Sequence, residues 1–146
     1  MKRIIGLDLG SVTCGVAVSD LMGMIASPVE TVRFENEDYD TCLEKLQPIF
    51  KKYNVTDIVL GLPKHMNGDI GIRGEISIQF KEMLESQGLE VILWDERLTT
   101  VAAHKTMNFL DINKNKKKNI VDTISAVYIL ETYLNKTKNS LQNWKK

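Results

Sequence analysis

The sequence predicts an α/β fold in which helices cover the faces of a mixed sheet, and three observations support this. Three strand-like segments follow one another before residue 34. From residue 38 onwards, stretches with helical periodicity alternate with short strand-like stretches. One of these, Asp57–Leu60, is a short apolar run typical of a buried parallel strand. An order of three strands followed by alternating helices and strands indicates a mixed sheet with helices packed on it.

The first three strand patterns predict an antiparallel meander. Arg3–Leu9 is followed by Gly15–Ser19 after a connection short enough for a hairpin, and Ser27–Arg33 follows a glycine-containing turn. Pro28 stands near the start of the third segment, where it suits a strand end or an edge strand because proline donates no ladder hydrogen bond.

Helices and strands then alternate. Pro48 lies inside the first helical pattern, where its missing N–H favours a kink or an early end. The expected helices are Asp38–Tyr53, Glu75–Ser86, Thr99–Leu110 and Ile120–Leu134, the expected strands are Asp57–Leu60 and Glu90–Trp94, and the expected loops are Lys64–Gly71 and Asp111–Asn119.

Length and composition bound the class of protein. The chain has 146 residues, 43% of them hydrophobic and 26% charged, which fits one globular domain. We expect this domain to span residues 1–134 and a polar, basic tail to span 135–146. No apolar run approaches the roughly 20 residues that cross a bilayer. Cys14 and Cys42 form no CxxC pair, so a reducing cytoplasm is the simplest location.

The zero net charge hides an asymmetry along the chain. Residues 1–100 carry 10 Lys and Arg against 16 Asp and Glu, whereas residues 101–146 carry 9 against 3. A basic C-terminal third can supply the phosphate contacts that dominate nucleic-acid affinity. The alternative is that these lysines only solvate loops and a tail.

Asp8 is the first carboxylate in an unexpected place. Alternation puts it on the same face of its strand as Ile4 and Gly6, and both faces otherwise look buried. A carboxylate there needs a partner or a cation. The C-terminal ends of parallel strands also form the usual ligand crevice of open sheets. The alternative is that Asp8 hydrogen-bonds the turn that follows it.

Two further carboxylates stand near the ends of predicted elements. Glu96 follows the last strand, with Asp95 as a rival and a surface salt bridge to Arg97 as the alternative interpretation. Asp122 lies in a helix that is apolar nearly all round, although a first-turn acid is also favoured by the helix dipole. Three such carboxylates would suit hard cations such as Mg²⁺, which prefer oxygen ligands, but spacing alone leaves their convergence open.

A set of motifs in one order resembles the YqgF family, also called RuvX, the Holliday-junction-resolvase-like family of bacteria. The similarity runs from Lys2 to about Leu134. The residues that carry it are Ile5–Ser11 (IGLDLGS), Gly15–Asp20 (GVAVSD), Gly61-Leu62-Pro63, Gly68, Arg73-Gly74-Glu75, Trp94–Thr100 (WDERLTT) and Asp122.

The resemblance implies a ribonuclease H-like fold with five strands in the order 3-2-1-4-5 and helices on both faces. It also implies a nuclease site at Asp8, Glu96 and Asp122 that holds two Mg²⁺ or Mn²⁺ ions. The family role is maturation of the 5′ end of precursor 16S rRNA in ribosome biogenesis, with ribosomal particles as further partners. An older assignment is cleavage of four-way DNA junctions, which favours a homodimer, whereas RNA trimming is compatible with a monomer.

Several positions depart from the family pattern. Many members carry a basic residue where this chain has Thr13 or Cys14, and a lysine where it has Thr123. They commonly show Asn-Met-Asp-Gly where this chain has His65-Met66-Asn67-Gly68. Other cations would then supply the phosphate contacts. The candidates are Lys64, Arg73, Arg97, Lys116 and Lys117.

Two other functions compete with a nuclease. Asp8-x-Gly10 also resembles the first phosphate loop of actin-like and sugar-kinase-like ATPases, but the chain has no second such loop. A non-catalytic RNA- or ribosome-associated factor is the other alternative, and retention of all three carboxylates disfavours it. We expect His65 and His104 to be surface residues because an oxygen-only metal site does not require them.

Overall fold

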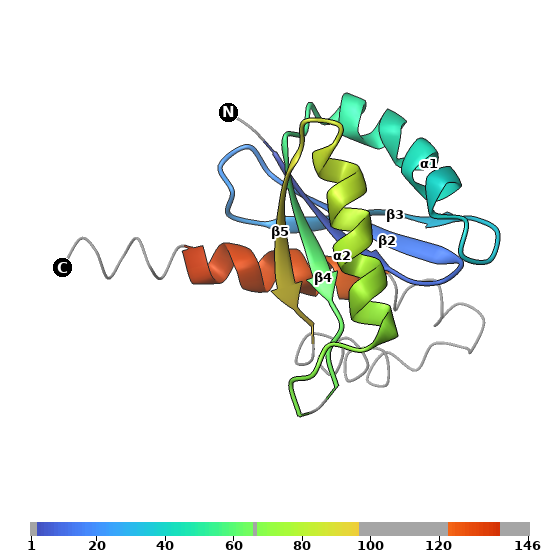
Figure 1. Cartoon of the computed structure of the whole chain (residues 1–146). Helices are drawn as coiled ribbons and strands as arrows, with labels where there is room; N and C mark the ends of the chain where they lie inside the picture. Colours follow the sequence, from blue (N-terminus) through green and yellow to red (C-terminus); the bar gives the residue numbers. More distant parts are fainter. Residues whose placement is uncertain (1–2, 66, 97–122, 138–146) are drawn as a thin grey trace, which may run out of the picture.

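The fold is a five-stranded mixed sheet with helices on both faces, as predicted (Figure 1). The structure is a computed structural model that describes residues 3–65, 67–96 and 123–137. The strands lie in the order β3-β2-β1-β4-β5, which is the predicted order. Their bounds are Ile4–Leu9 (β1), Thr13–Ser19 (β2), Ala26–Arg33 (β3), Asp57–Leu62 (β4) and Glu90–Asp95 (β5); helix α1 spans Tyr39–Lys52, helix α2 spans Ile72–Glu85, and a further helix covers residues 123–137.

Strand directions bring the site residues to one edge of the sheet. β1, β2 and β3 form the predicted antiparallel meander, with Pro28 on the edge strand β3. β4 runs parallel to both β1 and β5. The C-terminal ends of β1, β4 and β5 therefore lie side by side at one end of the strands, and Asp8 and Glu96 lie there.

Alternation along the strands separates two cores. Ile5 and Leu7 of β1 point to the face covered by α1 and α2, where the larger apolar cluster lies. Val59 of β4 and Ala17 of β2 point to the opposite face, where they pack against Ile129 and its neighbours on the helix at residues 123–137. Figure 1 shows this helix behind the sheet and α2 in front of it. Asp8 belongs by its alternation to the face of the C-terminal helix.

The C-terminal helix rests almost directly on the backbone of β1. A Cβ added at Gly6 would lie 2.8 Å from the Cβ of Leu130 and 2.9 Å from the carbonyl oxygen of Ala126. No ordinary side chain fits in that space, so Gly6 sets how closely the helix approaches the sheet.

Helix α1 agrees with the predicted Asp38–Tyr53 to within one residue at each end, whereas α2 starts earlier than predicted. Pro48 lies inside α1 and does not end it, because Leu46, Ile49 and Phe50 bury the helix on the core on either side of the proline. α2 begins at Ile72, three residues earlier than expected, so that Arg73 belongs to its first turn.

The C-terminal part of the chain is described in one stretch. The helix there continues to residue 137, beyond the predicted end at Leu134. The predicted helix Thr99–Leu110 and loop Asp111–Asn119 lie outside the described residues, and the boundary between a domain at 1–134 and a tail at 135–146 stays a prediction.

In the part of the chain that the structure describes, no helix is long and apolar enough to cross a membrane. The cytoplasmic location also stays a prediction.

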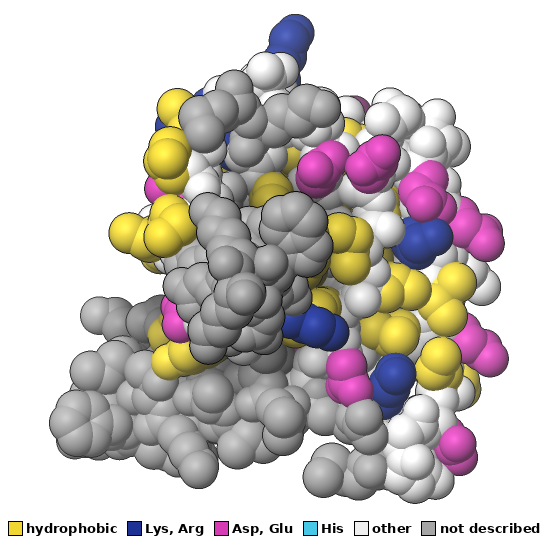
Figure 2. Space-filling model, turned by 90° about the vertical axis from the view of Figure 1, so that its left-hand side faces the viewer, with side chains coloured by type: hydrophobic (Ala, Val, Ile, Leu, Met, Phe, Trp, Pro, Cys, Tyr) yellow, Lys and Arg dark blue, Asp and Glu magenta, His cyan; other side chains and the backbone are white. Residues whose placement is uncertain are grey.

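The turn between β2 and β3 lies at the end of the sheet where β1 begins, opposite the end that carries Asp8. The side chain of Asp20 accepts hydrogen bonds from the backbone N–H groups of Met24 (2.7 Å) and Ile25 (2.9 Å), which hold the turn together. Figure 2 faces this side of the molecule and shows hydrophobic side chains at its surface. The exposed ones in the turn are Leu21, Met22, Met24 and Ile25.

The close approach at Gly6 predicts the effect of adding one methyl group. We expect Gly6→Ala to lower the free energy of unfolding by about 1–3 kcal/mol, because the helix must shift to admit the Cβ. Urea unfolding of the two proteins measures this. Ser27→Ala, at an exposed position of β3, is the control and should change stability by less than about 0.5 kcal/mol. Equal stability of the Gly6→Ala variant and the unsubstituted chain would contradict the packing described.

Candidate functional site

One row of residues crosses the sheet at the level of Asp8. Asp8 is partly buried near the end of β1 and pairs with Gly15 of β2, which in turn pairs with Thr31 of β3. The hydroxyl groups of Thr31 and Thr123 are 2.5 Å apart and form a hydrogen bond. Gly15, between Asp8 and Thr31 in this row, has no side chain. The hydrogen bond between Thr31 and Thr123 therefore attaches the start of the described helix to the row that contains Asp8.

On the other side of Asp8, Gly61 makes room for Glu96. Leu7 pairs with Leu60, so that Gly61 of β4 comes level with Asp8. The backbone N–H of Glu96 donates to the carbonyl oxygen of Leu62 (3.3 Å), which continues the ladder one residue past β5. A Cβ added at Gly61 would overlap the Oε2 atom of Glu96. The carboxyl group of Glu96 therefore occupies the space that any other residue at position 61 would fill.

This glycine explains how two carboxyl groups from non-adjacent strands meet. β1 and β5 are separated by β4, and two inter-strand spacings amount to about 10 Å. The side chain of Glu96 crosses above Gly61 and reaches Asp8, with which it forms a hydrogen bond. In the sequence, Gly61 stands in the Gly61-Leu62-Pro63 motif, and nothing in that pattern gives it a role. The available signal was its position at the end of a buried parallel strand next to the strand of Asp8.

The pair has an unusual protonation state. The pKa of Glu96 is raised to about 9, mainly by burial, and further by the charge of Asp8, the hydrogen bond to Asp8 and the charge of Asp95. Arg73 acts in the opposite direction and lowers that pKa. Near neutral pH, Glu96 is therefore protonated in the absence of a bound cation.

Asp95 and Glu96 occupy different surroundings, as strand alternation requires. The carboxylate of Asp95 lies 4.0 Å from the Nζ atom of Lys64, in an ion pair whose side chains are both partly exposed. Such pairs contribute little to stability. Glu96 forms a side-chain hydrogen bond with Asp8, and Asp95 is close enough for its charge to raise the pKa of Glu96.

The donor set at this edge fits a hard divalent cation in part. Two adjoining carboxyl groups supply the oxygen ligands that Mg²⁺ and Mn²⁺ take. Within residues 3–65, 67–96 and 123–137, no group of three or more His, Cys, Asp or Glu side chains is placed to hold a metal ion. Asp122, the third predicted ligand, lies outside these residues.

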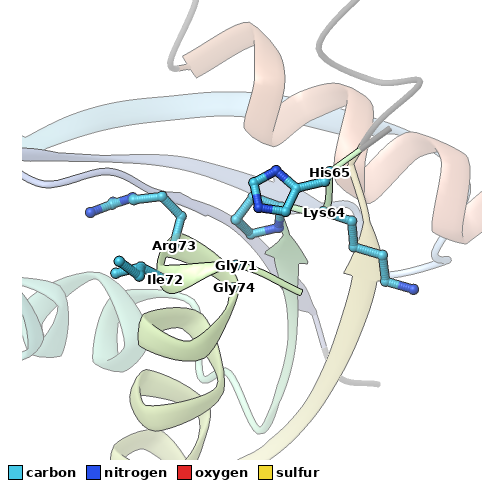
Figure 3. Close-up of a pocket in the computed structure, with 7 residues that line it drawn as sticks. Lys64, His65, Gly71, Ile72, Arg73 and Gly74 are labelled. Atoms are coloured by element: carbon cyan, nitrogen blue, oxygen red, sulfur yellow. The ribbon is translucent and has the colours of Figure 1, made fainter. Parts of the chain in front are cut away.

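A cavity of about 480 Å³ opens where the loop after β4 meets the start of α2 (Figure 3). Two of the predicted phosphate contacts, Lys64 and Arg73, line it, and Figure 3 shows their side chains pointing to opposite sides. The Nη1 atom of Arg73 donates a hydrogen bond to the hydroxyl group of Tyr39 (3.3 Å). The other predicted phosphate contacts, Arg97, Lys116 and Lys117, lie outside the described residues.

The raised pKa of Glu96 predicts how stability depends on pH. The folded chain holds a proton on Glu96 between pH 4.5 and about 9, whereas the unfolded chain has lost it. Stability conferred by this group therefore falls as the pH rises through that window. We expect Glu96→Gln, which keeps a neutral side chain, to raise the free energy of unfolding of the metal-free protein by at least about 1 kcal/mol at pH about 8.

Urea unfolding in a chelator at a series of pH values measures this difference. The advantage of the glutamine variant should grow from acidic to basic pH. Glu90→Gln, at an exposed position at the start of β5, is the matched control. If the Glu96→Gln variant is less stable than the unsubstituted chain at every pH, the protonated carboxyl pair does not exist.

Comparison with known proteins gives relatives over nearly the whole chain. The sequence profile described as "RuvX: Holliday junction resolvase" matches residues 2–136. A protein of Staphylococcus saprophyticus subsp. saprophyticus named "Putative pre-16S rRNA nuclease" is 47% identical over 134 residues, which cover 90% of this chain and 94% of that protein. A protein of the same name from Staphylococcus haemolyticus is 46% identical with the same coverage.

Solved structures agree on the fold. The chain is similar to Thermus thermophilus RuvC in complex with a Holliday junction substrate, with a TM-score of 0.55 and 9% identity over 88% of this chain and 92% of that one. It is also similar to the Fowlpox virus resolvase in complex with Holliday junction DNA, with a TM-score of 0.56 and 13% identity over 92% and 98%. At these identities the similarity bears on the fold, which is ribonuclease H-like. Because the RuvX profile covers residues 2–136 and relatives reach 47% identity, this chain belongs to the RuvX (YqgF) family.

Proposed function

We propose that this chain is a metal-dependent nuclease that hydrolyses phosphodiester bonds and matures the 5′ end of precursor 16S rRNA. The observation that carries the proposal is the contact between Asp8 and Glu96 above Gly61. Partly buried carboxyl groups that share a proton are costly for a fold to maintain unless a cation uses them. The names of the staphylococcal relatives support RNA as the substrate.

Mg²⁺ or Mn²⁺ would be held by Asp8, Glu96 and Asp122, with two ions as the expected number. Support for Asp122 comes from its neighbour in the chain, since Thr123 is hydrogen-bonded to Thr31 in the sheet row of Asp8. A divalent cation bound there supplies a Lewis acid that lowers the pKa of water for attack on phosphorus and stabilises charge on the leaving oxygen.

The remaining tasks belong to the chain's own residues. On binding of a cation, Glu96 would release to solvent the proton that it shares with Asp8, so that both carboxyl groups would be available as ligands. Arg73 and Lys64 bind backbone phosphates on either side of the cavity. Arg97, Lys116 and Lys117 supply further phosphate contacts in this proposal.

Asp8→Asn tests whether the chain is an enzyme. We expect the variant to fold and to bind nucleic acid but to lose cleavage, because it removes a charged oxygen ligand while preserving the size of the side chain. The measurement offers both proteins precursor 16S RNA, single-stranded RNA and four-way DNA junctions side by side, with Mg²⁺ or Mn²⁺. Normal cleavage by the variant across a metal titration would remove Asp8 from the site.

The same panel decides between substrates. Preference for precursor 16S RNA supports the proposal. Preference for the junction would favour the second candidate function, four-way junction resolution, which the description of the family profile supports. Binding of RNA without cleavage by either protein would indicate a non-catalytic RNA- or ribosome-associated factor.

Gly61→Ala tests whether the approach of the two carboxyl groups matters. The added Cβ must displace Glu96, since it would overlap the Oε2 atom and lie 2.7 Å from the Cδ1 atom of Ile129. We expect the rate of cleavage at saturating metal to fall about a hundredfold, the scale of a misplaced catalytic group. Gly6→Ala is the matched control, because it adds a Cβ beneath the same helix but does not touch the carboxyl groups.

The two alanine variants separate positioning from stability. Both should be less stable than the unsubstituted chain, so rates are compared per folded molecule, with circular dichroism reporting the folded fraction. Only Gly61→Ala should lose activity. Similar losses in both variants would mean that the helix contact, and not the meeting of Asp8 and Glu96, controls the rate.

A further inference from the structure

We infer that the cavity beside α2 binds one unpaired nucleobase of the substrate strand, next to the bond that is cut. The inference rests on the proposed nuclease function and specifies its substrate. The cavity is defined by Pro63, Lys64, His65, Gly71, Ile72, Arg73 and Gly74. It belongs to the same edge of the sheet as Asp8 and Glu96, because Pro63 directly follows β4.

The lining suits a flat, largely apolar group. Pro63 and Ile72 supply apolar walls, and Ile72 is 76% exposed although it is an isoleucine. Gly71 and Gly74 contribute backbone without side chains. A volume of about 480 Å³ lies in the range of sites that hold small organic ligands, and most of those sites are mainly apolar.

The imidazole ring of His65 offers a stacking surface at this cavity. A Cβ added at Gly71 would lie 2.5 Å from the Nε2 atom of His65, 3.1 Å from Cε1 and 3.3 Å from Cδ2, so that the ring lies over the glycine backbone (Figure 3). Proteins bind unpaired bases by stacking them on aromatic rings, histidine included, and this tolerates any base because each has a π-face.

The loop that carries His65 is held by its own hydrogen bonds. The backbone N–H of His65 donates to the carbonyl oxygen of Asp69 (2.9 Å), and that of Gly68 donates to the carbonyl oxygen of His65 (2.8 Å). The side-chain amide of Asn67 donates to the carboxylate of Asp69 (3.0 Å). The backbone that carries the ring is therefore already ordered before a base stacks on it.

Cations lie on both sides of the cavity, as a strand that passes through it requires. Figure 3 shows Lys64 and Arg73 extending in opposite directions from the cavity, with His65 between them. Each nucleotide of a strand has a phosphate on either side, so one inserted base places a phosphate near each cation. The Nζ atom of Lys64 lies 4.0 Å from the carboxylate of Asp95, the neighbour of Glu96 in the chain, so the cavity adjoins the carboxyl pair.

This geometry selects among nucleic acids. A base in the cavity cannot remain paired or stacked in a duplex, and extracting it from one costs a few kcal/mol. Single-stranded RNA offers its bases without that cost. The inference therefore predicts cleavage beside an unpaired nucleotide, and it disfavours a fully paired four-way junction.

The test uses short single-stranded RNA that carries 2-aminopurine, whose fluorescence is quenched on stacking, and a duplex of the same sequence. Binding is measured to the Asp8→Asn chain with Mg²⁺, so that cleavage does not interfere. We expect quenching on binding of the single strand and weaker affinity for the duplex. His65→Ala in that chain should weaken single-strand binding roughly tenfold and abolish quenching, whereas His65→Phe should retain both.

A matched pair of isoleucine variants isolates the cavity. Ile72→Ala should weaken single-strand binding severalfold, whereas Ile25→Ala, at a 63% exposed position on the opposite edge of the sheet, should have no effect. Quenching that does not change in His65→Ala, or equal affinity for the duplex, overturns the inference. Cleavage by the unsubstituted chain is measured separately. Cleavage without His65-dependent quenching would support the nuclease function and overturn only the base site. His65-dependent quenching without cleavage would support the base site and contradict the nuclease function.

Discussion

The contact between the carboxyl groups of Asp8 and Glu96 is the constraint on which the site depends. Two acids from strands that are not neighbours can meet only if the strand between them presents no side chain, and Gly61 of β4 meets that requirement. Burial and the charge of Asp8 then raise the pKa of Glu96 to about 9. A pair that retains one proton near neutral pH is electrostatically costly, and a divalent cation that replaces the proton would relieve that cost.

Glycine on the same face of the sheet also serves the packing of the C-terminal helix. The helix at residues 123–137 packs on Gly6, and Thr123 is attached to Thr31 across Gly15. These contacts place the start of the described helix over the row that contains Asp8. Close packing and carboxylate approach therefore both depend on glycines on this face, Gly6 for the helix and Gly61 for Glu96. Ile5 and Leu7 of β1 face α1 and α2 instead.

Local patterns predicted most of the fold because each depends on neighbours in the chain. Strand alternation placed Asp8 on the correct face, and the proline in β3 indicated an edge strand. Local rules left the outcome open where tertiary packing decides it. Pro48 does not end α1, since the helix is buried on both sides of it. The start of α2 was predicted at Glu75 but lies at Ile72, so Arg73 belongs to the first turn of the helix.

By itself, the sequence established the order of the elements, the strand order through resemblance to a family, and the three candidate carboxylates. It left Asp95 and Glu96 as rivals, because adjacent residues differ only in the direction that strand register assigns them. Tertiary structure separated them: Asp95 lies near Lys64, whereas Glu96 crosses Gly61 to reach Asp8. The sequence could not predict the cavity lined by His65 either, because it forms only when the loop after β4 packs against the start of α2. Such contacts join residues from different elements, and their distances follow from packing and not from spacing along the chain.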